Sequence, residues 1–125
     1  NKLESGKDES LRSIQDLKVS SHFLVTRQGN LIQFVPIHKR AWHAGISNYA
    51  GRKNCNDFSI GIELEGCDDE EFESEQYQSL SQLIHFLSHD LKISKQNIVG
   101  HADIAPGRKT DPGPYFNWDL LKSML

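Results

Sequence analysis

The sequence has little that would place it in a membrane or on a nucleic acid. Within its 125 residues no apolar run approaches the length that spans a bilayer, and no signal-like hydrophobic segment is visible. Its net charge of -3 gives no electrostatic reason to bind nucleic acid or an anionic membrane surface. The length instead fits a single domain with one core.

Cysteine is scarce as well. Cys55 and Cys67 are the only two, and they do not form a C-x-x-C pair. Two reduced thiols in a cytoplasmic protein are the plain interpretation, and a disulfide or a metal role is the alternative. Because Asn1 is not an initiator methionine, we expect the sequence to be a piece of a longer protein. The expected cytoplasmic localisation therefore depends on whether the missing N-terminal part carries a targeting signal.

The order of patterns predicts an α/β fold, in which helices pack on a sheet. Segments 19–26 and 31–35 are expected to pair as a hairpin, with Gly29 or Asn30 at positive φ in the turn. Residues 59–64 read as a central buried strand and 98–99 as a short one. Residues 36–56 lack periodicity and are expected to form a long, functional loop.

Helices are predicted in three places: a short one around 11–17, a long one after an N-cap at Ser74, and a last one capped by Asn117. The long helix shows the strongest pattern, with its apolar face formed by Tyr77, Leu80, Leu83, Ile84, Leu87 and Leu91. His85 and His89 are four residues apart, which suits a metal. Both lie off that face, so solvent exposure is the simpler interpretation. The acidic run 68–75 reads as a surface turn.

Residues 100–114 concentrate polar chemistry in one stiff segment with three prolines and three glycines. We expect no helix or strand to run through it. His101 and Asp111 supply an imidazole nitrogen and a carboxylate oxygen, a pair that suits Zn²⁺. A catalytic zinc needs a third protein ligand, for which His22 and His43 are the internal candidates.

Three further residues could support chemistry beside such a metal. Glu63, at the end of a strand, could act as general base toward a water, although a solvated pair with Glu65 is the alternative. Lys109 could stabilise an oxyanion or be an ordinary surface lysine. Trp42 could stack on a sugar or pack into the core.

Four stretches carry a resemblance to a known family: VSSHFLV (19–25), KRAWHAG (39–45), CNDFSIGIELEG (55–66) and GHADIAPGRKTDPGP (100–114). The chain resembles the zinc-dependent N-acetylmuramoyl-L-alanine amidases of the type-2 family, which are related to peptidoglycan recognition proteins. The resemblance implies a central mixed sheet flanked by helices in one amidase domain, 1–125, that lacks its N-terminal strand. It also implies one Zn²⁺ and cleavage of the amide between anhydromuramic acid and L-Ala in peptidoglycan recycling, with an anhydromuropeptide as substrate.

The same resemblance implies roles for individual residues. His101 and Asp111 match zinc ligands, Glu63 the carboxylate that activates water, and Lys109 the lysine that stabilises the oxyanion. The implied substrate contacts are Trp42 on the sugar side, Ala105 beside the peptide, and Lys18 and Asn54 toward the stem-peptide carboxylates. Asn54 departs from the cation that the family uses there.

The first zinc ligand of the family has no match in the sequence. In the family it is a histidine on an earlier strand, whereas residues 1–18 contain no histidine and His22 corresponds to a different position. We expect that ligand in a missing N-terminal segment. The rival function is a non-catalytic module that binds peptidoglycan fragments. A structural role for His101 and Asp111 in a partner-binding protein is a third possibility. The presence of Asp111 and Lys109 favours an enzyme.

Overall fold

The structure is a computed structural model that describes residues 21–67 and 69–125. The predicted helix around 11–17, the start of the first predicted strand and the candidate residue Lys18 lie outside the described residues. Within them, no helix combines the length and the apolar character that crossing a membrane requires.

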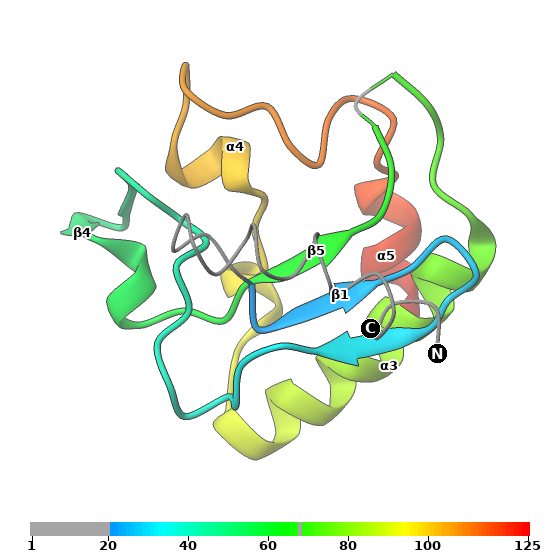
Figure 1. The fold of residues 1–125 in the computed structure, drawn as a ribbon, viewed down its shortest axis with the longest axis horizontal. Coiled ribbons are helices and arrows are strands. Elements are labelled where there is room, and N and C mark those ends of the chain that lie inside the picture. Colours follow the sequence, from blue (N-terminus) through cyan, green and yellow to red (C-terminus); the bar gives the residue numbers. More distant parts are fainter. Residues whose placement is uncertain (1–20, 68) are drawn as a thin grey trace, which may run out of the picture.

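The described residues form a mixed three-stranded sheet (Figure 1). Its strands are β1 (Phe23–Val25), β2 (Leu31–Gln33) and β5 (Ile62–Leu64), in the order β2-β1-β5. β1 pairs antiparallel with β2 and parallel with β5. Gly29 takes a φ of 86° in the turn between β1 and β2, which confirms the predicted hairpin.

Within the described residues, the predicted strand 59–64 is shorter, at 62–64, and is neither central nor fully buried. In the part of the chain that is described, β1 is central and β5 lies at the edge, because β5 pairs only with β1. Its Ile62 and Leu64 are half-buried and Glu63 between them is exposed.

The predicted long loop 36–56 contains regular structure of its own. A two-stranded sheet joins β3 (Asn48–Tyr49) to β4 (Arg52–Lys53), and a 3-10 turn, η1 (Cys55–Asp57), follows. Ala50 and Gly51 both have positive φ, as a tight hairpin turn requires. Alanine rarely takes that conformation, so a turn at this place could not be predicted from residue type.

The long helix α3 (Ser74–Leu91) lies along one face of the sheet (Figure 1). Glu73, not Ser74, is its N-cap, and the side chain of Gln76 accepts a hydrogen bond from the Glu73 N–H at 2.9 Å. Five of the six residues of the predicted apolar face are buried, whereas Leu91 is 44% exposed because the helix ends there. His85 and His89 are exposed, as predicted.

The acidic run is at the surface, and two of its glutamates form ion pairs with an arginine from the turn after β1. Arg27 pairs with Glu70 at 3.1 Å and with Glu73 at 2.9 Å. These exposed pairs tie the turn that follows β1 to the start of α3, and each contributes little energy in water.

The C-terminal third contains η2 (Lys95–Asn97), α4 (His101–Ile104) and α5 (Trp118–Met124). Residues 98–99 form no strand, which corrects the prediction. No helix or strand runs through 100–114, although one helical turn forms at its start, at 101–104. The Asp103 carboxylate accepts the Gly100 N–H at 2.7 Å and so starts one helical turn, which ends at Ile104 because Pro106 restricts the residue before it. Asn117 caps α5, as predicted, through the Leu120 N–H at 2.9 Å.

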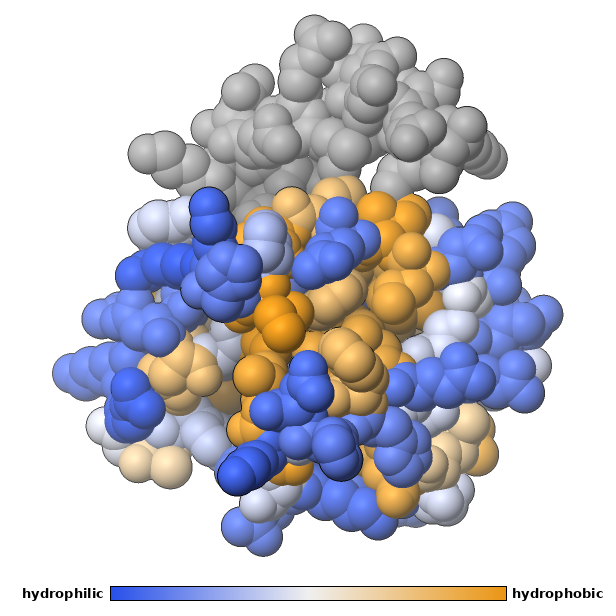
Figure 2. Space-filling model, turned by 90° about the horizontal axis from the view of Figure 1, so that it is seen from below, coloured by the Kyte–Doolittle hydropathy of each residue, from blue (hydrophilic) through white to orange (hydrophobic). Residues whose placement is uncertain are grey.

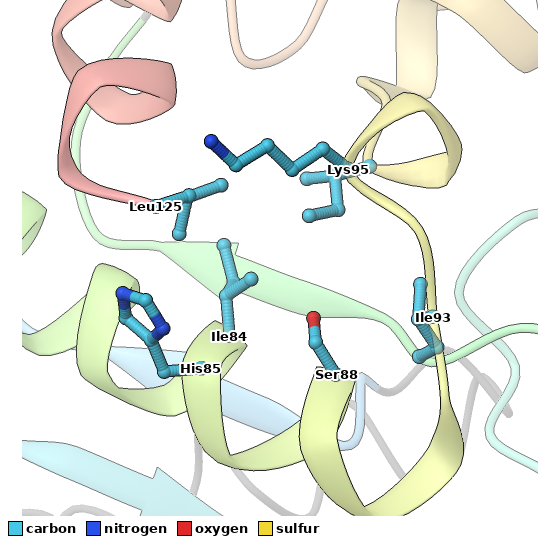
Figure 3. A pocket seen from close by; sticks show the side chains of 7 residues that line it. Ile84, His85, Ser88, Ile93, Lys95 and Leu125 are labelled. Atoms are coloured by element: carbon cyan, nitrogen blue, oxygen red, sulfur yellow. The ribbon is translucent and has the colours of Figure 1, made fainter.

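The core lies between α3, α5 and the sheet. Its largest cluster is formed by Tyr77, Leu80, Ile84, Phe116 and Leu121. Figure 2 shows one face of the molecule, where apolar side chains gather in the middle and polar ones surround them. A small pocket between α3, η2 and Leu125 is shown in Figure 3, and none of the candidate site residues lines it.

Leu121 and its neighbour Leu120 provide a test of this packing. Leu121 is 1% exposed within the core, whereas Leu120 is 40% exposed on the same helix. We predict that Leu121→Ala lowers the free energy of unfolding by about 3 kcal/mol through the cavity it leaves. Leu120→Ala should cost less than about 1 kcal/mol. Urea denaturation of both variants measures the difference, and equal losses would place Leu121 outside the core.

Candidate active site

Successive side chains of β5 point to opposite faces of the sheet, one toward the core and one away from it. Ile62 and Leu64 pack against the cluster beneath α3, so Glu63 points to the opposite face of the sheet. The charges of Asp111, His101 and Lys109 all act on the Glu63 carboxylate, which places it close to these residues. Glu63 therefore faces the segment that carries His101.

His101 and Asp111 come together although ten positions separate them. His101 opens α4, and the Ala102 N–H donates to the backbone oxygen of Asp111 at 3.0 Å. This backbone hydrogen bond holds the His101 and Asp111 side chains close together. The His101 Nδ1 and the Asp111 Oδ2 lie 3.2 Å apart.

The Ala44 carbonyl determines which nitrogen of His101 carries a proton. The His101 Nε2 lies 2.9 Å from that carbonyl oxygen, which can only accept, so Nε2–H is the donor. In the neutral ring Nδ1 then presents a lone pair to the Asp111 carboxylate, which is also an acceptor. Two facing acceptors require a proton or a cation between them.

Their separation suits a metal ion. Ligand bonds of 2.0–2.2 Å in tetrahedral geometry place a nitrogen and an oxygen about 3.4 Å apart, close to the observed 3.2 Å. A histidine ligand whose other ring N–H donates to a backbone carbonyl is typical of metal centres. Across the described residues, however, no group of three His, Cys, Asp or Glu side chains is arranged to hold a metal. The pair fits two ligands of a site and no more.

Electrostatics link Glu63 and Lys109 to this pair. Partial burial, followed by the negative charge of Asp111, raises the pKa of Glu63, while His101 and Lys109 oppose the rise. One ionisation that responds to all three groups indicates that the four side chains share one site.

His22 is not available as a third ligand because both of its ring nitrogens are occupied. Its Nε2 lies 2.6 Å from the Lys39 carbonyl oxygen, and its Nδ1 accepts the Gly61 N–H at 3.2 Å. The ring is 1% exposed. His22 therefore ties the beginning of the 36–56 segment to the residue that precedes β5.

His43 is held nearby as a neutral ring. Its Nε2 lies 3.2 Å from the Ser59 hydroxyl oxygen, which donates its own hydrogen to the Cys55 carbonyl and so accepts from His43. Gly61 allows the close approach of the ring, since a Cβ there would lie 2.4 Å from its Cγ. Burial, and next the nearby His22, lowers the pKa of His43 to about 4.

Asn56 was missed at the sequence level. It is buried, and its side-chain oxygen accepts the N–H groups of His43 and Ala44 at 3.0 and 2.8 Å. These bonds fix the backbone that presents the Ala44 carbonyl to His101. Its place in the matching stretch CNDF was the only signal, because a buried amide cannot be told from an exposed one in a sequence.

The remaining candidates lie around this centre in different settings. Trp42 is 46% exposed, with the Arg40 guanidinium 4.2 Å from its ring centroid, so it does not pack into the core. Ala105 is buried, and its carbonyl accepts the N–H groups of Arg108 and Lys109. Asn54 is exposed with a φ of 57° at the start of η1.

A family model for N-acetylmuramoyl-L-alanine amidase matches residues 1–114. The chain belongs to this amidase family. It is 53% identical over 112 residues to the 1,6-anhydro-N-acetylmuramyl-L-alanine amidase AmpD of Escherichia coli K12, covering 90% of this chain and 61% of that protein. It is 42% identical over 130 residues to the N-acetylmuramoyl-L-alanine amidase AmiD of the same organism, covering 91% of this chain and 47% of AmiD.

Solved structures of amidases agree with the fold. A crystal structure of AmpD matches with a TM-score of 0.86 and 48% identity, covering 91% of this chain and 64% of that one. AmiD of E. coli, in complex with anhydro-N-acetylmuramic acid-L-Ala-D-γ-Glu-L-Lys, matches with a TM-score of 0.86 and 41% identity, over 94% of this chain and 52% of that one. The chain spans about 60% of the length of the curated AmpD amidases that it matches.

The neutral His43 of this amidase chain should make stability depend on pH. Its folded pKa of about 4 lies below the unfolded value of about 6.5, so the unfolded chain binds the extra proton between those values. Stability should therefore be full above pH 6.5 and fall by roughly 2–3 kcal/mol as the pH decreases to 4.

Urea denaturation at several pH values measures this effect. His43→Gln should flatten the dependence between pH 6.5 and 4, whereas His89→Gln, on the exposed side of α3, should leave it unchanged. An unaltered slope in His43→Gln would show that other groups cause the loss.

Proposed function

We propose that this chain carries the catalytic face of an amidase that hydrolyses the bond between anhydro-N-acetylmuramic acid and the L-alanine of a peptidoglycan stem peptide. The observation that carries the proposal is the pairing of His101 Nδ1 with Asp111 Oδ2, beside Glu63 and Lys109, in a member of the amidase family. The substrate class is that of AmpD and AmiD, as their names and the AmiD complex describe.

We further propose that His101 and Asp111 are two ligands of a Zn²⁺ ion. When bound there, the ion would polarise the scissile carbonyl and make a water more acidic. A third protein ligand would come from outside the described residues. We also place the protein in the cytoplasm in a peptidoglycan recycling role, a compartment where free thiols such as Cys55 and Cys67 are usual.

Glu63 acts as the general base in this proposal. Its carboxylate accepts a proton from the attacking water and then donates it to the nitrogen of the departing L-alanine. A carboxyl group with a raised pKa suits this double role, because it binds the proton more readily than an ordinary surface glutamate. Lys109 donates to the oxygen that becomes negative as the carbonyl is attacked.

The proposed substrate contacts surround this centre. Trp42, which is half-exposed beside the Arg40 guanidinium, would contact the sugar. Ala105 would contact the peptide side. By resemblance, Lys18 and Asn54 match positions with which the family contacts the stem-peptide carboxylates. Asn54 is uncharged and would recognise a carboxylate by hydrogen bonds alone, more weakly than a cation does.

The role of Glu63 as base can be tested by comparing it with Glu65, two residues further along the chain. We predict that Glu63→Gln lowers turnover by about 10²–10⁴-fold, because the amide cannot accept the proton. Metal content should stay the same. Glu65→Gln is the matched control, since Glu65 accepts the Arg27 N–H at 2.8 Å and takes no part in the site.

The assay incubates the protein with anhydromuropeptides and follows the release of free peptide by mass spectrometry, with and without a chelator. Normal turnover by Glu63→Gln would remove Glu63 from the role of base. Substrate binding by the unaltered protein, without release of peptide, would instead identify a binding module.

A further inference from the structure

The backbone oxygen of Ala44 is a shared acceptor. It receives the His101 Nε2–H at 2.9 Å and a second donor, the Arg108 Nη2, at 2.5 Å. A carbonyl oxygen has two lone pairs, so both bonds can form at once. The carbonyl that orients the His101 ring is therefore also bound by the positively charged guanidinium of Arg108.

The guanidinium of Arg108 fixes more than this one oxygen. Its Nη2 and Nε also donate to the Ile46 carbonyl, at 2.8 and 3.2 Å. The planar fork therefore holds two carbonyls, on either side of Gly45, in one orientation. Because the Arg108 N–H is bonded to the Ala105 carbonyl at 3.1 Å, the fork starts from the turn that directly follows α4.

Gly45 makes room for this arrangement. It has a φ of 63°, and a Cβ at this position would lie 2.8 Å from the Arg108 Nη2. A side chain here would therefore displace the guanidinium in addition to straining the backbone. Gly51 has a comparable φ of 86°, but a Cβ there would meet nothing within 4 Å.

We propose that Arg108, seated on Gly45, is a positioning residue that holds the Ala44 carbonyl against His101 and so keeps the ring in the Nε2–H form, with Nδ1 free to bind a metal. This inference rests on the proposed Zn²⁺ site. It assigns to Arg108 a role in metal affinity through Ala44, without contact with the ion or with the substrate.

The test compares Zn²⁺ affinity in matched variants, measured by competition with a chromophoric chelator. Arg108→Ala and Gly45→Ala should each bind Zn²⁺ about 10-fold or more weakly, the usual loss when a partner behind a ligand is removed. Their double variant should lose little more than either alone, because both act through one contact. The controls are Arg52→Ala, which removes an arginine stacked on Phe58, and Gly51→Ala.

A second measurement separates positioning from general stability. In the metal-free protein, ¹⁵N NMR of the imidazole should show the Nε2–H form of His101, and Arg108→Ala should increase the fraction of the Nδ1–H form. A change in stability alone would not alter this ratio. If Arg108→Ala fails to fold, Gly45→Ala provides the same comparison against Gly51→Ala.

The outcomes distinguish this inference from the function on which it rests. Affinities of Arg108→Ala and Gly45→Ala within twofold of their controls would overturn the positioning role, provided that Asp111→Asn loses Zn²⁺. Zn²⁺ affinity that is unchanged in Asp111→Asn would overturn the metal site itself, and the role of Arg108 with it.

Discussion

The contact between the Ala44 carbonyl and the His101 ring joins two segments 57 residues apart and is the interaction on which the site depends. Neither segment has a regular element long enough to hold it in place. The Ala44 side is fixed from within by Asn56, and the His101 side by the backbone bond from Ala102 to Asp111. Because a carbonyl oxygen can only accept, this contact also selects the His101 tautomer that carries its hydrogen on Nε2.

The sheet contributes the opposite half of the site with few residues. Strand alternation alone sends Ile62 and Leu64 into the core and Glu63 to the other face. A shift of one residue in the pairing with β1 would bury the carboxylate beneath α3, at a high cost in free energy. The apolar packing of β5 therefore also specifies where the carboxylate lies.

Periodic segments could be predicted from the sequence, and contacts between distant segments could not. The apolar face of α3 was visible in its spacing, and the hairpin in Gly29. The roles of Asn56 and Arg108 were not, because each depends on which backbone groups of another segment lie nearby. The helical turn at 101–104 was missed because the bond that starts it, from the Gly100 N–H to the Asp103 carboxylate, lies in a segment whose prolines and glycines indicate a loop.

The pKa of Glu63 and the His101–Asp111 pair are coupled by charge. The negative Asp111 is one of the causes that raise the pKa of Glu63, so a positive ion on the pair would offset that cause and favour the ionised base. By the same coupling, an ionised Glu63 favours a cation at the pair.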